Sequence, residues 1–296
     1  MTDFERKGAK MQFRKYHGLG NDYLVIDPKV VGIKLTPDVI RLICHRNYGI
    51  GSDGILYGPM GSGEMPELRI FNPDGSEAEK SGNGLRIFAK YLFENKYVRT
   101  KNFKVKTLGG IVDVTIQDDA ASMIRINMGK VTFVSTEIPV TGKKREVVDE
   151  ELEIGKKKYR ITCLSIGNPH CVIPMADLTE AKARDLGPYV ENHKVFPSRI
   201  NMQLLKVVDR ANIEIRIWER GAGYTLASGS SSCAAAAAAH RLGLVDNTIN
   251  VNMPGGTILV EIGEYGEIFM TGAVEGVFEG TLHKDLMKKL KADLGK

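Results

Sequence analysis

The sequence predicts an α+β protein made of two pseudo-symmetric domains, each a curved β-sheet or barrel around a central helix. Three observations support this fold class. Apolar β-type stretches lead through glycine-rich turns into helical patterns at Ser81 and again at Ser228. Several landmarks recur at nearly one offset along the chain. The length of 296 residues suits two domains of ordinary size.

The second of these helices has an unusual composition. Its start is rich in serine, from Ser228 to Ser232, and six alanines follow, from Ala234 to Ala239. Alanine is the best helix former and needs little space, so this helix is expected to lie deep in a core. The first turn of a helix leaves backbone N–H groups free at the positive end of its dipole, which is a ready anion site. The structural alternative is an ordinary buried helix with a serine cap.

Four ordered landmarks argue for two copies of one α/β unit. Residues 70–75 lead through Ser81-Gly-Asn-Gly into the helical pattern of residues 85–92, as the second helix does later in the chain. The pairs at an offset of 147 are Ser81 with Ser228, Asn72 with Glu219, and Gly20-Asn21 with Gly167-Asn168, and Gly109-Gly110 and Gly255-Gly256 are 146 apart. The predicted domains are residues 11–128 together with 275–296, and residues 129–274. Residues 273–280 are expected to return to the first domain.

The local pattern assigns the elements in order. In the first copy we expect strands at 11–16, 23–26, 68–71, 102–106, 111–117 and 122–128, helices at 37–44 and from Ser81, and a loop at 47–56. In the second copy we expect strands at 158–165, 172–174, 200–208, 248–253, 257–262 and 267–272, and helices at 178–186 and from Ser228. A short basic helix is expected at 284–294.

Composition restricts the class of protein. Apolar residues make up 43% and charged residues 26%, which are globular values. The formal charge of +5 comes from scattered lysines, so neither a nucleic-acid nor a membrane partner is expected. Cys44, Cys163, Cys171 and Cys233 lack metal-type or redox spacing. They are interpreted as reduced core residues of a cytoplasmic protein without signal peptide or membrane span. A homodimer is left open.

Motifs spread over nearly the whole chain resemble those of the diaminopimelate epimerase family. They are His17-Gly-Leu-Gly-Asn-Asp, Phe71-Asn-Pro-Asp-Gly-Ser-Glu, Gly82-Asn-Gly, Gly167-Asn-Pro-His170, Trp218-Glu-Arg-Gly-Ala-Gly and Gly229. The resemblance implies two α/β domains with a cleft between them. It also implies an isomerase of lysine biosynthesis that interconverts LL- and meso-diaminopimelate by two-site proton transfer at Cα. No cofactor is implied, whether pyridoxal phosphate, metal or nucleotide.

The same resemblance assigns site residues. Family members carry catalytic cysteines where this chain has Ser81 and Ser228. The backbone N–H groups that hold the α-carboxylate correspond to Gly82, Asn83, Gly229 and Ser230, and helix dipoles there oppose the charge that α-proton removal creates. The positions that hold the distal amino-acid end of the substrate correspond to Asn72, Asn168, Asn201, Glu219 and Arg220, of which the arginine suits a carboxylate. Asn21 and His170 also match family site positions.

Four positions depart from the family pattern. Besides the two serines, Gly54 stands where some members have Gln, and Tyr224 stands where many have Glu; both are taken as supporting positions. A cysteine thiol has a pKa near ~8.5, whereas an aliphatic hydroxyl resembles water, whose pKa is near ~15.7. An alkoxide therefore costs on the order of 10 kcal/mol more than a thiolate, and a helix dipole contributes only ~1–2 kcal/mol to an anion. Either the serines serve to trap a ligand or the chain is a natural branch with altered chemistry.

Structural alternatives accompany each assignment. The alternative for the serines is a plain helix cap. For Glu219 and Arg220 it is a surface pair, and for His170 it is a core position. Asn21 and Asn168 suit left-handed turn positions, and Asp22, Asp53 and Asp74 are interpreted as turn formers rather than acids. Three classes of function follow: an amino-acid racemase or epimerase, a relative with other proton chemistry such as dehydration or isomerisation, and a non-catalytic amino-acid-binding protein. Each takes a small amino acid as its ligand.

Overall fold

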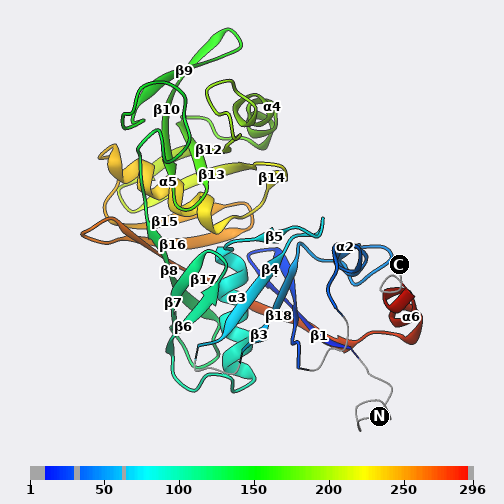
Figure 1. Ribbon diagram of the computed structural model, residues 1–296. Helices are drawn as coiled ribbons and strands as arrows, with labels where there is room; N and C mark the ends of the chain where they lie inside the picture. The colour runs from blue at the N-terminus through cyan, green and yellow to red at the C-terminus, as the bar shows by residue number, and fades with distance from the viewer. Residues whose placement is uncertain (1–10, 30–33, 62–64, 293–296) are drawn as a thin grey trace. The chain divides into compact units, whose positions relative to one another are not determined.

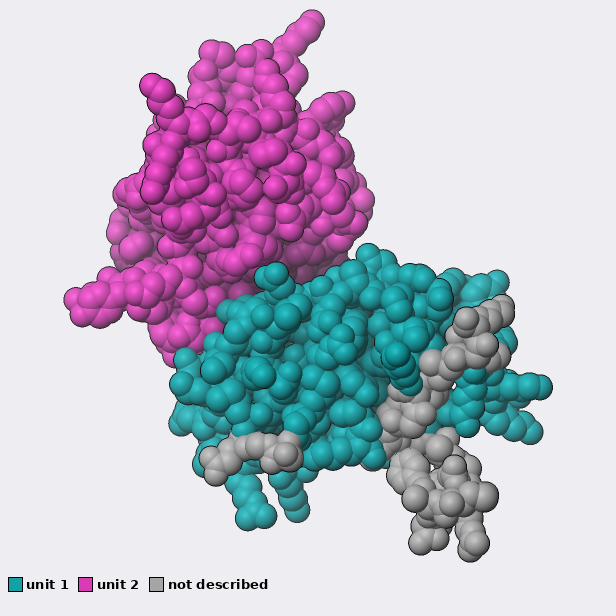
Figure 2. All heavy atoms as spheres, viewed as in Figure 1, with its two compact units in different colours: residues 1–124, 273–296 teal, residues 125–272 magenta. Residues whose placement is uncertain are grey.

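The computed structural model of the chain describes residues 11–29, 34–61 and 65–292 (Figure 1). The chain divides into two compact units, which Figure 2 colours separately. Unit 1 comprises Met1–Ile124 with Ala273–Lys296, and unit 2 comprises Arg125–Gly272. These divisions fall a few residues before the boundaries at 128/129 and 274/275 that the sequence repeat indicates.

Unit 1 is a mixed sheet wrapped around one helix, α3 (Gly82–Glu94). Its strands are β1 (Gln12–Gly18), β2 (Asn21–Ile26), β3 (Ile55–Met60), β4 (Glu67–Phe71), β5 (Glu77–Ala78), β6 (Asn102–Thr107), β7 (Gly110–Ile116) and β18 (Glu275–Thr281). β2 pairs parallel with β3, β4 pairs parallel with β6, and the other pairings are antiparallel. Because β18 pairs with β1, the expected return of the chain to the first unit is confirmed.

Unit 2 repeats this plan around α5 (Gly229–Arg241). Its strands are β9 (Glu150–Ile154), β10 (Lys157–Ser165), β11 (Pro169–Pro174), β12 (Asn201–Asp209), β13 (Asn212–Glu219), β14 (Gly223–Thr225), β15 (Thr248–Met253), β16 (Gly256–Ile262) and β17 (Glu267–Ala273). β17 also pairs with β8 (Met123–Lys130), the strand where the chain enters this unit. β11 pairs parallel with β12 and β13 parallel with β15, as their counterparts do in unit 1.

The repeat extends to individual strand registers. In unit 1, Leu24 faces Ile55 across the parallel pair β2–β3, and in unit 2 Cys171 faces Met202 across β11–β12. Both partners differ by 147 positions between the units. The glycines in the left-handed region recur in the same way, with Gly20 at φ 85° and Gly167 at φ 98°. One backbone design therefore occurs twice in this chain.

The two central helices are buried on nearly every side. In α5, Ala234 to Ala239 are at most 3% exposed, and strands β10, β11, β12, β13, β15 and β16 all contact the helix. A helix that is apolar all round fits only inside a core, and alanine lets the surrounding strands come close. α3 is also enclosed, but it fills its space with larger side chains such as Leu85, Ile87 and Phe88. The expected deep position of the alanine-rich helix is confirmed.

Three further helices cover outer parts of the units. α2 (Pro37–Cys44) and α6 (Lys284–Ala292) contribute to one apolar cluster of unit 1, and α4 (Glu180–Glu191) contributes to an apolar cluster of unit 2. In α4, a Cβ at Gly187 would lie 2.3 Å from the indole of Trp218. Only glycine therefore allows this close packing of helix against strand. The last two residues of the helix expected at 284–294 lie outside the described residues.

Most predicted elements are present within one to three residues of their expected bounds, with a few differences. The strands β3, β5, β9 and β14 were not predicted, and the loop expected at 47–56 ends two residues earlier because β3 begins at Ile55. The helix expected at 178–186 continues to Glu191. All four cysteines are buried and free, as predicted. Within the described residues, no helix is long and apolar enough to cross a membrane.

Candidate active site

Ser81 lies at the start of α3, where its backbone is extended (φ −138°, ψ 120°). Its Oγ accepts a hydrogen bond from the N–H of Gly84 at 3.0 Å, which is an N-cap interaction. The hydroxyl of Tyr23 lies 3.2 Å from the same Oγ. The predicted helix start is confirmed, and the cap oxygen has a phenol as its neighbour.

Ser228 has the same position at the start of α5, with φ −149° and ψ 129°. Its Oγ accepts from the N–H of Ser231 at 3.4 Å, and its carbonyl accepts from the hydroxyl of Ser232 at 2.8 Å. The amide of Gln203 donates to the hydroxyl of Ser231 at 3.0 Å. The serine run of this helix is therefore held by buried polar contacts within unit 2.

Each helix start leaves two backbone donors available. Gly82 and Asn83 are the first two residues of α3, and Gly229 and Ser230 are the first two residues of α5. Their N–H groups have no acceptor among the residues that the structure describes. Intrahelical bonding cannot reach the first N–H groups of a helix, and the dipole makes that end positive. Each unit thus presents a small site suited to a carboxylate.

An asparagine supports each helix start, Asn21 at the beginning of β2 and Asn168 in the bend just before β11. In unit 1 the amide of Asn83 donates to Oδ1 of Asn21 at 3.0 Å, and in unit 2 the amide of Asn168 approaches Oγ of Ser230 at 3.4 Å. The pairs Asn21–Asn168 and Asn83–Ser230 are each 147 apart. The prediction that these two asparagines could serve only as left-handed turn residues is wrong, because neighbouring Gly20 and Gly167 take the left-handed conformation instead.

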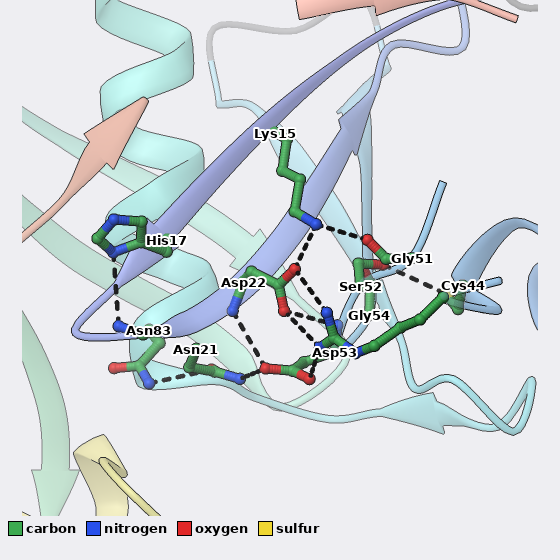
Figure 3. A network of polar contacts seen from close by, with 12 residues as sticks. Lys15, His17, Asn21, Asp22, Cys44, Gly51, Ser52, Asp53, Gly54 and Asn83 are labelled. Atoms are coloured by element: carbon green, nitrogen blue, oxygen red, sulfur yellow. Dashed lines mark hydrogen bonds and ion pairs between the residues drawn. The ribbon is translucent and has the colours of Figure 1, made fainter. Parts of the chain in front are cut away.

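A charged network continues from Asn21 in unit 1 (Figure 3). Oδ2 of Asp53 accepts from the amide of Asn21 at 2.9 Å and from the backbone N–H of Asp22 at 3.2 Å. Asp22 pairs with Lys15 at 2.6 Å and with Arg46 at 2.9 Å. The turn interpretation of Asp22 was wrong, because this residue lies in β2 and is buried. Burial raises its pKa, but hydrogen bonds from Arg46 and Lys15 outweigh that effect and hold the pKa at about 2.

His170 lies in β11 and is fully buried. Its Nε2 lies 3.0 Å from Oδ1 of Asn168. Because that oxygen accepts only, the imidazole is assigned as the Nε2–H tautomer. Burial lowers the pKa of His170 to about 3, so the ring is neutral at pH 7. His170 thereby holds the asparagine that contacts Ser230. Its core position is confirmed, and its role in the site stays a prediction.

The residues assigned to the distal end of the substrate are partly brought together. Oδ1 of Asn201 accepts from the backbone N–H of Arg220 at 2.9 Å, and its amide donates to the carbonyl of Pro169 at 2.8 Å. Arg220 itself donates to the carbonyl of Ser198 at 2.9 Å. Asn72 instead closes its own turn by bonding the hydroxyl of Ser76 at 2.9 Å. Glu219 is the last residue of β13, next to this group in the sequence.

The two supporting positions have different surroundings. Gly54 is buried, and its carbonyl accepts from the backbone N–H of Leu24 at 3.1 Å. Tyr224 lies in β14, packs against the apolar cluster of unit 2 and carries the guanidinium of Arg184 4.7 Å from its ring centroid. Burial raises the pKa of Tyr224. Among the described residues, Tyr224 makes no hydrogen bond to Ser228.

Two contributors were missed from the sequence. Tyr23 is 147 positions from His170, so the repeat itself was an available signal for a role in the site. Glu191 is buried and accepts from the indole N–H of Trp218 at 2.7 Å and from the backbone N–H of Gly221 at 3.0 Å. It holds the turn that carries Arg220. Its position at the end of α4 gave no periodic or motif signal.

The fold first defines a class of protein. Solved structures with the same fold include a probable proline racemase from Agrobacterium radiobacter (TM-score 0.69, 15% identity, covering 93% of each chain). A Bacillus anthracis protein of the PhzF phenazine biosynthesis family also matches (TM-score 0.64, 15% identity, covering 93% of this chain and 99% of the other). At these identities the likeness shows the fold alone, which is the two-unit α/β fold of racemases, epimerases and PhzF proteins.

Sequence comparison then identifies the family. The family model for diaminopimelate epimerase matches residues 13–134 and 162–277. Diaminopimelate epimerase 2 of Nostoc sp. is 53% identical over 277 residues, covering 93% of this chain and 97% of the relative. The diaminopimelate epimerase of Synechococcus elongatus is 39% identical over 276 residues, covering 92% and 98%. The chain belongs to the diaminopimelate epimerase family, whose named members are isomerases.

Proposed function

We propose that this chain interconverts stereoisomers of diaminopimelate by proton transfer at Cα, without a cofactor. The observation that carries the proposal is the pair of equivalent helix starts, Ser81 on α3 and Ser228 on α5, each with two free N–H donors and a supporting asparagine. The substrate is taken from the name of the relative that is 53% identical. Inversion at carbon needs a proton donor and an acceptor on opposite faces, and two copies of one half-site supply that symmetry.

The backbone donors carry the main catalytic effect in this proposal. When the Cα–H bond breaks, its electron pair delocalises into the α-carboxylate, where negative charge increases. In each unit the first two N–H groups of the central helix are suited to that charge, and such preorganised donors are worth several kcal/mol to a transition state. The proton leaves on one face of Cα and another returns on the opposite face. Ser81 and Ser228 occupy the positions from which these transfers are made.

The proposed chemistry sets an upper limit on rate. A hydroxyl with a pKa near ~15.7 is a much weaker acid than a thiol with a pKa near ~8.5. The free energies of ionisation differ by an amount on the order of 10 kcal/mol. We therefore expect the serine chain to be slow, and we expect Ser81→Cys with Ser228→Cys to raise inversion by several orders of magnitude. Each single variant is expected to promote exchange at Cα with little inversion, because one base removes and returns the proton on the same face.

The test measures deuterium incorporation at Cα and inversion by NMR, in D2O, with LL- and meso-diaminopimelate as substrates. The parent chain, both single variants and the double variant are compared. A parent chain that inverts the substrate at an ordinary enzyme rate would show that other groups do the proton transfer. A double variant that binds diaminopimelate and neither exchanges nor inverts it would refute the proposed reaction.

The distal end of the substrate is assigned to Glu219 and Arg220 in the same proposal. A guanidinium suits the second carboxylate, and the carboxylate of Glu219 suits the second ammonium. Arg220→Met is expected to weaken diaminopimelate binding by at least about 30-fold, since loss of a paired charge costs ~2–5 kcal/mol. Calorimetry measures the affinity, with Arg210→Met as control, because Arg210 pairs with Asp246 on the surface of the same unit. Equal affinity in the two variants would exclude this assignment.

A further inference from the structure

Tyr23 is joined directly to the cap serine of unit 1. It lies in β2, is 7% exposed, and its hydroxyl is 3.2 Å from Oγ of Ser81. The same Oγ accepts from the N–H of Gly84 at 3.0 Å. With one lone pair occupied by this backbone donor, Oγ keeps its own hydrogen and a second lone pair. A proton can therefore pass in either direction between the phenol and the serine hydroxyl.

The absence of a side chain at Gly54 makes room for this tyrosine ring. A Cβ at position 54 would lie 2.7 Å from Cε1 of Tyr23 and 2.6 Å from the carbonyl oxygen of Phe71. Real Cβ atoms do not come so close, so any larger residue would displace the ring or the strand. Gly54 was one of the departures from the family pattern, and its position against Tyr23 gives that departure a physical reason.

The phenol supplies the acidity that the serine lacks. An ordinary phenol ionises near ~10, while an aliphatic hydroxyl resembles water near ~15.7. At a given pH, the phenolate of a tyrosine is thus roughly 10⁵–10⁶ times more populated than a serine alkoxide. A hydroxyl that passes its proton to a phenolate need not exist as a free alkoxide. The pair Tyr23–Ser81 is consequently a better base than Ser81 alone.

We propose that Tyr23 is the positioning and ionising partner of Ser81, and that the two side chains form a proton relay in the unit 1 half-site. This inference rests on the proposed function. In the abstraction step, the Cα–H proton passes to Oγ of Ser81 while the hydrogen of Ser81 passes to the phenolate oxygen of Tyr23. The electron pair of the C–H bond stays on the substrate and delocalises into its carboxylate. In the reverse step, the phenol donates to Oγ as Oγ donates to Cα.

Unit 2 lacks the same arrangement. His170 is the repeat counterpart of Tyr23, but its Nε2 contacts Oδ1 of Asn168 at 3.0 Å rather than the cap serine. The relay is therefore assigned to unit 1 alone. It follows that loss of the phenol should affect the transfer made at Ser81 and leave the transfer at Ser228 to its own groups.

The experiment places Tyr23→Phe in the parent chain and in a Ser81→Cys chain. The rate of deuterium exchange at Cα is measured separately for LL- and meso-diaminopimelate at several substrate concentrations, and the rate compared is that of the stereocentre whose proton is removed at Ser81. In the parent we expect a loss of at least about 100-fold in kcat with KM changed less than about twofold, because general acid–base groups contribute 10²–10⁴-fold. In the Ser81→Cys chain we expect Tyr23→Phe to lower kcat by less than about threefold, because a thiol ionises without the phenol. If the role of Tyr23 were purely structural, Tyr23→Phe would lower kcat by the same factor in the parent and in the Ser81→Cys chain.

Tyr16→Phe is the matched control. Tyr16 is buried in β1 of the same unit, and its hydroxyl bonds Glu94 at 2.8 Å without contacting Ser81. Its exchange rate should stay within about twofold of the parent. Equal losses from Tyr23→Phe in the two backgrounds, or no loss in the parent, would overturn the relay. If the double-cysteine chain exchanges the Cα proton and the parent does not, the relay is wrong and the proposed function still holds. Failure of every chain to bind diaminopimelate in calorimetry overturns both.

Discussion

The starts of α3 and α5 have the same backbone and different side-chain chemistry. Both present a serine cap, two N–H donors without an acceptor among the described residues, and a supporting asparagine. Behind α3 the supporting groups are charged, with the fully buried Arg86 donating to Asn83 at 2.8 Å and an ion-paired cluster around Asp22. Behind α5 they are neutral, with Gln203 and an uncharged His170.

The comparison shows that the repeat preserves the backbone donors of the two helix starts and not the side chains around them. The backbone donors are set by helix geometry, so both copies keep them whatever side chains follow. The side chains that hold those donors are independent of the repeat and have become different in each copy. Since two faces of one carbon require opposite proton transfers, unlike supports around alike donors suit an epimerase better than identical ones.

The largest expected effect compares the two helix interiors. Phe88→Ala in α3 should lower the free energy of unfolding by about 3–5 kcal/mol, because it leaves a cavity. Ala236→Leu in α5 should lower the free energy of unfolding by about 1–3 kcal/mol or more, because the larger side chain overpacks the core. Phe88 and Ala236 are both fully buried, and strands surround α5. Denaturant unfolding measures both. Leu226→Ala, at a residue 54% exposed, is the control and should stay within about 0.5 kcal/mol. Tolerance of Ala236→Leu would contradict the tight enclosure of α5.

The second prediction tests the neutral support of unit 2. Burial holds the pKa of His170 at about 3, below its ordinary 6.5, so the unfolded chain binds more protons between these values. Stability is then lost as the pH falls through this window, by about 2 kcal/mol between pH 7 and pH 5. His170→Gln should remove that loss. Urea unfolding at the two pH values measures it, with His283→Gln as an exposed control. An unchanged pH dependence in His170→Gln would show that other groups cause the acid loss.

The smallest effect compares the two caps. Replacing an N-cap serine by alanine costs ~0.5–2 kcal/mol. Ser81→Ala should lie near the upper end, because its cap bond is 3.0 Å long and Tyr23 also loses a partner. Ser228→Ala should lie near the lower end, because its cap bond is 3.4 Å long. Thermal unfolding measures both, beside Thr36→Ala, which removes the cap of the outer helix α2. A larger loss at Ser228 would reverse the comparison.

The sequence by itself determined the local and repeated features. Helix starts at Ser81 and Ser228 follow from serine and glycine preceding strong helix formers, and the buried alanine helix follows from composition. The landmarks at 147 residues indicated two copies, and the motifs around Asn168 and Arg220 led to the family. These signals lie within short stretches, or at a constant spacing, so they can be recognised without coordinates.

Only the tertiary structure decided which side chains support the helix starts. Asn21 meets Asp53 across 32 positions, Tyr23 meets Ser81 across 58, and Trp218 meets Glu191 across 27. Each contact joins separate elements, so it depends on strand order, on the bend before β3 and on space left by residues such as Gly54. A hydrogen bond needs atoms within about 3 Å, and only the packed chain brings residues so far apart in sequence to that distance.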